Sequence, residues 1–84
     1  MWIQTQEGEL LNLDHVEFIR VEENEDDQTF ELRAYPVQVG EPDEDLYYLL
    51  AWAEDESAVR FTLTSVISAM TNGVGFLHLG GSVR

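Results

Sequence analysis

Polar and apolar side chains alternate along much of the first half of the chain, a pattern typical of strands that bury one face. Residues 1–6 alternate in this way, and Gly8 offers a tight turn before the apolar run at 10–13. We therefore expect the chain to open with a β-hairpin.

Two further strands are expected in the middle of the chain. Asn12, Asp14 and His15 interrupt the alternation with side chains that bond to nearby backbone, so we expect a turn or bulge before a strand at 16–21. Residues 29–35 alternate cleanly, which predicts a strand with one dry and one wet face. Its dry face would carry Phe30, Leu32 and Ala34, and its wet face Glu31, Arg33 and Tyr35.

The segment 46–53 has no polar side apart from two tyrosine hydroxyls. Such a strand is covered on both faces, so we expect the domain's own helix on one face and another layer or subunit on the other. Pro36 limits further pairing of the preceding strand, so 37–39 is expected to form an edge or a bend.

The period of the apolar residues changes after the third acidic patch. A helical spacing links Val59, Leu63, Val66, Ile67 and Met70. Asp55 is a candidate N-cap and Asn72-Gly73 a stop signal, so this spacing predicts a helix between them. Alternation around Phe61 and many β-branched residues leave a partly extended 58–71 as the alternative. A last short strand is expected at 74–79.

These elements predict an α+β fold, with an antiparallel sheet of about five strands and one C-terminal helix packed on one face. Apolar residues make up 44% of the 84 residues, enough for one hydrophobic core. Because no repeat or linker divides the chain, we expect residues 1–84 to form a single domain.

The chain is strongly acidic, with 17 Asp and Glu residues against 4 Arg and a net charge of −13. Most of the acidic residues lie in patches at 22–31, 41–45 and 54–56, as expected of loops that connect strands. This charge disfavours direct binding to nucleic acids and anionic membranes, because phosphate recognition needs clustered Lys and Arg. Basic proteins and divalent cations are the partners that such a surface suits.

The segment from Phe61 to Val83 contains no Asp, Glu, Lys or Arg, and His78 is its one titratable side chain. It is too rich in hydroxyl and amide groups for a membrane span. We therefore expect this segment to lie inside the fold or against a partner.

The composition also excludes several kinds of chemistry. The absence of cysteine removes disulfides, thiolate zinc sites and thiol nucleophiles, and residues 1–7 lack the features of a secretory signal. We therefore expect a cytoplasmic protein without a cofactor. No Gly-x-Ser-x-Gly elbow or phosphate-binding loop is present, and the acidic run at 22–27 fails the pattern of a calcium-binding EF-hand.

Two histidines are the candidates for acid–base chemistry. One is His15, which follows Asp14 and has Glu17 nearby, and the other is His78 in an apolar strand. An Asp-His pair of this kind is more often a turn cap, and a histidine in a strand more often bonds a backbone carbonyl or lies at an interface. No catalytic, cofactor-binding or metal-binding residue is therefore assigned.

Aromatic and apolar residues near the expected strand 46–53 and the last strand are the interface candidates, because hot spots of protein interfaces favour aromatic residues. They are Tyr47, Tyr48, Leu50, Trp52, Phe76 and His78. The leading hypothesis is a non-catalytic interaction module that forms a homo-oligomer, either a dimer or a small ring. The alternatives are an acidic decoy or inhibitor of a basic protein, for example one that binds nucleic acids, and a small enzyme using His15 or His78.

The opening Trp2-Ile3-x-Thr5-x-x-Gly8, followed by Asn12-Leu13-Asp14-x-Val16, resembles that of small uncharacterised bacterial proteins. These proteins open with a similar hairpin and end with a helix after several strands. The resemblance covers residues 1–16 by motif and the remainder by element order. It implies a bacterial origin and an α+β fold, and it carries no assigned activity. Their final helix is rich in Glu, whereas 58–72 carries only Arg60, which suggests that this helix is covered.

Overall fold

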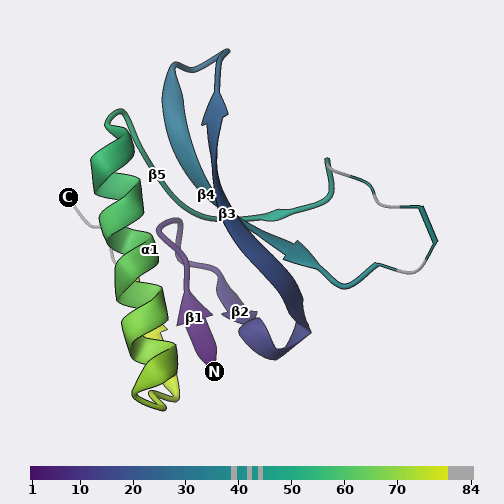
Figure 1. Cartoon of the computed structure of the whole chain (residues 1–84), viewed down its shortest axis with the longest axis vertical. Coiled ribbons are helices and arrows are strands. Elements are labelled where there is room, and N and C mark those ends of the chain that lie inside the picture. The colour runs from purple at the N-terminus through teal and green to yellow at the C-terminus, as the bar shows by residue number, and fades with distance from the viewer. Residues whose placement is uncertain (39, 42, 44, 80–84) are drawn as a thin grey trace.

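The computed structural model describes residues 1–38, 40–41, 43 and 45–79, which form an α+β structure (Figure 1). Its elements in chain order are β1 (Trp2–Gln4), β2 (Leu10–Asn12), the 3-10 helix η1 (Leu13–His15), β3 (Val16–Asn24), β4 (Thr29–Pro36), β5 (Tyr48–Ala53), α1 (Glu56–Thr71) and β6 (Phe76–His78). One α-helix therefore follows five of the strands, as the sequence predicts.

The described strands form two three-stranded sheets, in place of the single sheet of about five strands expected from the sequence. One sheet has the order β3-β4-β5 and is antiparallel throughout. The other has the order β2-β1-β6, and in it β1 and β6 run parallel. Alternation along a strand specifies which face is buried but not which strand lies beside it, so the pattern could not separate the two sheets.

The expected hairpin and turn near the N-terminus are confirmed. Gly8 adopts a φ of 95°, in the left-handed region that glycine enters without strain, and connects β1 to β2. The Asn12 side chain then accepts a hydrogen bond of 3.0 Å from the backbone N–H of Asp14 and so caps η1. This short helix redirects the chain from one sheet into the other.

The first acidic patch lies only partly in a loop. Asn24 pairs with Thr29, so the connection between β3 and β4 is confined to 25–28, while Glu31 lies within β4. The expectation that the whole patch forms a connection is therefore wrong. Glu22 and Glu23 can continue β3 because β3 is an edge strand, whereas Glu31 lies in the central strand β4.

A β-bulge accounts for part of the apolar character of β5. Leu49 pairs with Arg33 and Ala51 pairs with Leu32, which leaves Leu50 as an extra residue in the strand. Leu50 and its neighbour Ala51 are both buried, at 0% and 5% exposure. Leu50 thus belongs to the core and not to any surface of the chain.

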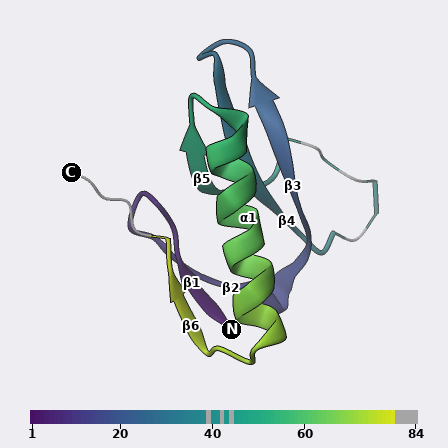
Figure 2. The ribbon, with the colours of Figure 1, turned by 60° about the vertical axis from the view of Figure 1, so that its left-hand side comes forward.

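The predicted helix is confirmed as α1, and the extended alternative for 58–71 is wrong. The Asp55 side chain accepts a hydrogen bond from the Ser57 N–H, and Gly73 follows the helix with a φ of 70°. α1 packs on β4 and β5 across one face of their sheet (Figure 2). In the described residues, no helix has the length and apolar character needed to cross a membrane.

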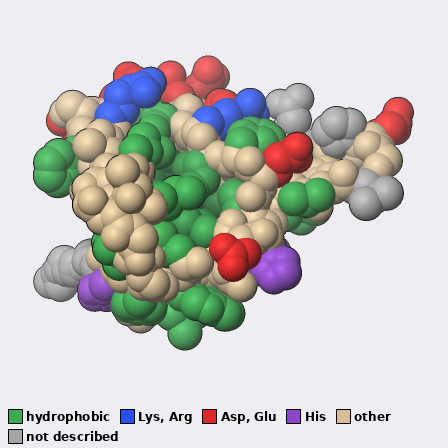
Figure 3. Space-filling view, turned by 60° about the horizontal axis from the view of Figure 1, so that its bottom comes forward, with side chains coloured by type: hydrophobic (Ala, Val, Ile, Leu, Met, Phe, Trp, Pro, Cys, Tyr) green, Lys and Arg blue, Asp and Glu red, His purple; other side chains and the backbone are tan. Residues whose placement is uncertain are grey.

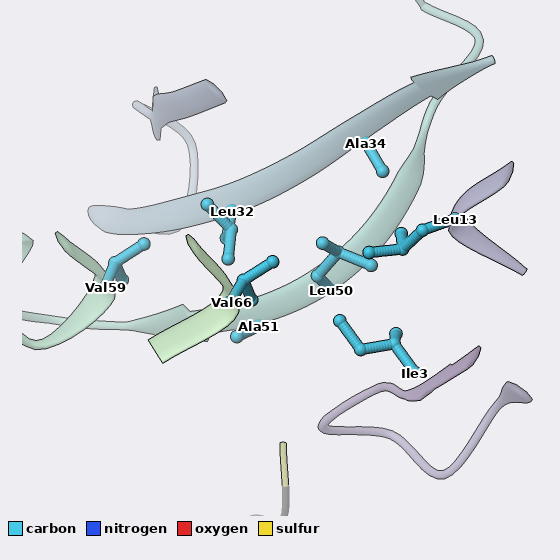
Figure 4. Close-up of a cluster of buried hydrophobic side chains, with 8 residues drawn as sticks. All are labelled: Ile3, Leu13, Leu32, Ala34, Leu50, Ala51, Val59 and Val66. Atoms are coloured by element: carbon cyan, nitrogen blue, oxygen red, sulfur yellow. The ribbon is translucent and has the colours of Figure 1, made fainter. Parts of the chain in front are cut away.

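The core lies between α1 and both sheets (Figure 4). Its buried hydrophobic cluster consists of Ile3, Leu13, Leu32, Ala34, Leu50, Ala51, Val59 and Val66. Gln6 adds a polar link between the sheets, because its N–H donates to the Leu50 carbonyl at 2.8 Å and its Oε1 accepts from the Trp52 N–H at 2.8 Å.

Candidate interaction surfaces

The side of α1 that faces away from the sheets carries large apolar side chains in water. Phe61, Ile67 and Met70 are 73%, 54% and 56% exposed, whereas Val59, Val66 and Ala69 are buried. We define the outer side of α1 as the exposed residues Phe61, Thr64, Ile67, Ser68, Met70 and Thr71, which follow the exposed Arg60. Arg60 is paired with Glu56, and α1 carries no other charged side chain, which is unusual for a helix with a solvent side.

An apolar groove runs between α1 and the start of β3. Its walls are formed by Leu13, Val16, Glu17, Phe18 and Ile19 on one side and by Leu63, Val66, Ile67 and Met70 on the other. Figure 3 looks onto an end of the molecule where hydrophobic side chains gather. Ile67 and Met70 were expected on the buried helical face, and they remain exposed because they border this groove.

The face of the β3-β4-β5 sheet opposite α1 carries a network around Glu31, which was expected to lie on a wet face. Glu31 is only 7% exposed, and its Oε1 accepts hydrogen bonds of 2.8 Å from Arg33. The Tyr47 hydroxyl donates to the same oxygen at 3.5 Å, and Asn24 donates to Oε2 at 3.0 Å. A buried carboxylate is tolerated here because charged and polar donors surround it.

Aromatic rings and guanidinium groups cover the rest of this face. The rings of Phe18 and Tyr35 stack at 4.6 Å, and the guanidinium carbons of Arg20 and Arg33 lie 4.8 Å and 4.2 Å from the ring centres of Tyr35 and Tyr47. Tyr35 is 2% exposed, so the expected wet face is largely closed. Burial lowers the pKa of Arg33, but its interactions with Tyr35, Glu31 and Tyr47 outweigh that effect and raise it.

An acidic hollow lies beside this network. It is lined by Glu7, Asp27, Thr29, Glu31, Leu49 and Trp52, and Trp52 is 41% exposed. Carboxylates next to an indole ring suit a cationic side chain. Within the described ranges, no group of three or more His, Asp or Glu residues has an arrangement that could hold a metal ion.

The interface candidates chosen from the sequence do not form one surface. Tyr48 lines a hollow with Leu10 and Leu11 beside the first hairpin, whereas Trp52 faces the acidic hollow and Tyr47 contacts Arg33. Phe76 and His78 are exposed on β6, in the other sheet. The candidates omit Phe61, which lies opposite the buried face of the helix. The signal that could have identified it is a large aromatic residue at a solvent-facing helical position, in a segment without Asp, Glu, Lys or Arg.

The residues considered for acid–base chemistry are also separate. Asp14 accepts a hydrogen bond of 3.3 Å from the N-terminal ammonium group, and His15 and Glu17 are exposed. His78 lies on β6, outside this turn. The described side chains therefore bring no second titratable group to either histidine in a hydrogen-bonded pair.

No protein family model, curated protein or solved structure matches the chain.

Proposed function

We propose that this chain is a non-catalytic protein-interaction module that self-associates, as a dimer or small ring, through the outer side of α1 and the adjoining groove. The carrying observation is the exposure of Phe61, Ile67 and Met70 on a helix whose charged side chains are confined to the Glu56–Arg60 pair in its first turns. Covering apolar surface stabilises an assembly by about 25 cal/mol for each Å² removed from water.

Electrostatics opposes the approach of a second copy least at this surface. Each chain carries a net charge of −13, so two copies repel each other wherever their acidic loops approach. The outer side of α1 allows contact without opposing like charges. A basic partner would gain most at the acidic surfaces instead, because opposite charges attract there.

The test is the oligomeric state of the purified chain, measured by sedimentation velocity over a range of salt concentrations. We expect a dimer or small ring whose association strengthens with added salt, because salt screens the repulsion between copies. Ile67→Asp should yield a monomer, since it places a charge in the contact. Val37→Asp is the matched control, because Val37 is 65% exposed in the segment after β4. A wild-type chain that stays monomeric under all these conditions contradicts the proposal.

A second candidate function, binding of a basic protein, is favoured by the acidic hollow beside Trp52. A lysine side chain entering this hollow would meet Glu7, Asp27 and the indole ring. Titration with oligolysine should then change Trp52 fluorescence, and the change should weaken as salt is added. The Trp2→Phe variant isolates the Trp52 signal, and an unchanged spectrum at low salt argues against this candidate.

A further inference from the structure

We infer that the outer edge of β3 binds an extended, basic segment of another protein, which adds to the β3-β4-β5 sheet as a further strand. This inference rests on the second candidate function, binding of a basic protein, and specifies where and how that partner is held. Three features carry it: a backbone edge that no other described strand pairs with, an apolar groove beside that edge, and carboxylates that flank the apolar positions.

The edge selects the conformation of the partner. β3 runs over nine residues, Val16–Asn24, and β4 is its one neighbour among the described strands. Its other side presents backbone groups at the spacing of a strand, and a segment in the extended conformation complements such groups. The opposite edge of the same sheet differs, because Gln6 bonds Leu50 and Trp52 of β5 there. β3 is therefore the edge at which this sheet can grow.

The groove beside β3 selects apolar side chains. α1 packs on β4 and β5, and the groove of about 330 Å³ lies between α1 and the first residues of β3. Ile67 and Met70 on its α1 side are exposed, and Ile19 and Val21 of β3 pack against the core from the same face of the sheet. Since side chains of a strand alternate between the two faces of a sheet, every second residue of the partner would point toward this apolar surface.

Carboxylates flank these apolar positions. Glu17 lines the groove, and Glu23 lies on the same face of β3 as Val21, because it pairs with Phe30, which packs against the core. Glu17 and Glu23 are both exposed, and the adjoining loop 25–28 adds three acidic residues.

This distribution of charge specifies the sequence pattern of the partner. Four alternate positions of the added strand would face β3 on the groove side. Lys or Arg suits the first and the last of them, and apolar residues suit the two between. A second copy of the chain, with its net charge of −13, is a poorer match for this edge.

The probe for this inference is a peptide of sequence Lys-Thr-Val-Thr-Val-Thr-Lys with blocked ends, and its control replaces both Lys by Glu. The measurement is amide hydrogen exchange of the protein by NMR. We expect exchange to slow at every second amide of β3, because successive amides of a strand point to opposite sides. The slowing should reach about tenfold when the peptide concentration is about ten times its dissociation constant. The Glu peptide should leave exchange unchanged.

Matched variants separate this edge from the rest of the acidic surface. Glu17→Gln combined with Glu23→Gln keeps the shape of both side chains and removes their charge, so the Lys peptide should bind about 2-fold to 30-fold more weakly. Glu25→Gln combined with Asp26→Asn removes the same charge from the adjoining loop, and it should weaken binding less. Equal effects of the two double variants would mean that the partner recognises net charge and not the edge of β3.

The remaining outcomes distinguish this inference from the function on which it rests. A Lys peptide that binds and shifts only signals around Trp52 would overturn strand addition at β3 and leave binding of a basic protein standing. A peptide that does not bind at low salt would remove both. Slowed exchange along β3 in the protein alone, increasing with protein concentration, would show that a second copy occupies this edge and would overturn the choice of a basic partner.

Discussion

At the scale of single residues, the side chains of β4 are the least predictable part of the structure. Alternation placed Glu31 and Tyr35 in water, yet both are buried. The partners that make this possible come from other segments, with Asn24 at the end of β3 and Tyr47 before β5. Since no local pattern links these segments, the sequence predicts the alternation of β4 correctly but not the burial of its polar face.

The buried ion pair predicts a measurable cost when its charge is removed. Glu31→Gln leaves the Arg33 guanidinium, with a side chain only 17% exposed, without its carboxylate. We expect the free energy of unfolding to fall by about 1–3 kcal/mol in urea denaturation, because the remaining charge is poorly solvated. The control is Glu22→Gln, whose carboxylate pairs with Arg20 at 2.6 Å but is 36% exposed. Its loss should stay below about 1 kcal/mol, and equal losses would contradict this account.

At the scale of elements, the parts predicted well are those with local signals. Gly8 in the first turn, Asp55 at the helix start and Gly73 after its end all occupy the expected positions. The bulge at Leu50 has no such signal, because it depends on the register between β4 and β5. The bulge buries the two successive residues Leu50 and Ala51. In the sequence this is visible only as a strand that lacks a polar face.

The N-cap of α1 predicts a pH dependence of stability. Hydrogen bonds from the Ser57 hydroxyl and backbone N–H lower the pKa of Asp55 below its ordinary value of 3.8. A carboxyl with a lower pKa in the folded state contributes stability above its unfolded pKa and loses it as the pH falls through the folded pKa. Asp55→Ala should therefore lower the melting temperature at neutral pH and have progressively less effect below pH 3.8.

Asp55→Asn is the control for this prediction, because an asparagine caps helices about as well as aspartate and does not titrate. Its melting temperature should stay near that of the wild type at neutral pH. A constant difference between Asp55→Ala and the wild type into strong acid would show that the carboxylate is not responsible.

One of the two hydrogen bonds that Gln6 makes to β5 depends on its side chain. Gln6→Ala removes the acceptor for the Trp52 N–H, and we expect a loss of about 1 kcal/mol in unfolding free energy. Hydrogen exchange at the Trp52 amide should accelerate more than exchange within the β3–β4 hairpin. Gln4→Ala is the control, since its side chain bonds only the Gly8 carbonyl at 3.4 Å in the first hairpin. Uniform acceleration of exchange would mean that Gln6 acts on global stability alone.

At the scale of the whole molecule, the charge of −13 opposes folding as well as association. Since 17 acidic residues face 4 Arg in the sequence, repulsion should outweigh attraction. We expect the melting temperature of the Ile67→Asp variant to rise with added sodium chloride at a fixed, low protein concentration. This variant separates intramolecular repulsion from self-association, which would also raise the melting temperature. A melting temperature that falls with salt would show that ion pairs dominate.

The parallel pairing of β1 with β6 has a consequence for synthesis on the ribosome. β1 is made first among the described elements and β6 last, yet Trp2 stands beside Phe76 in the finished sheet. The β3–β4 hairpin can form as soon as it emerges, because its partners are close in sequence. One edge of β1 therefore stays unpaired until β6 has been made, and during that time this edge is open to mispairing.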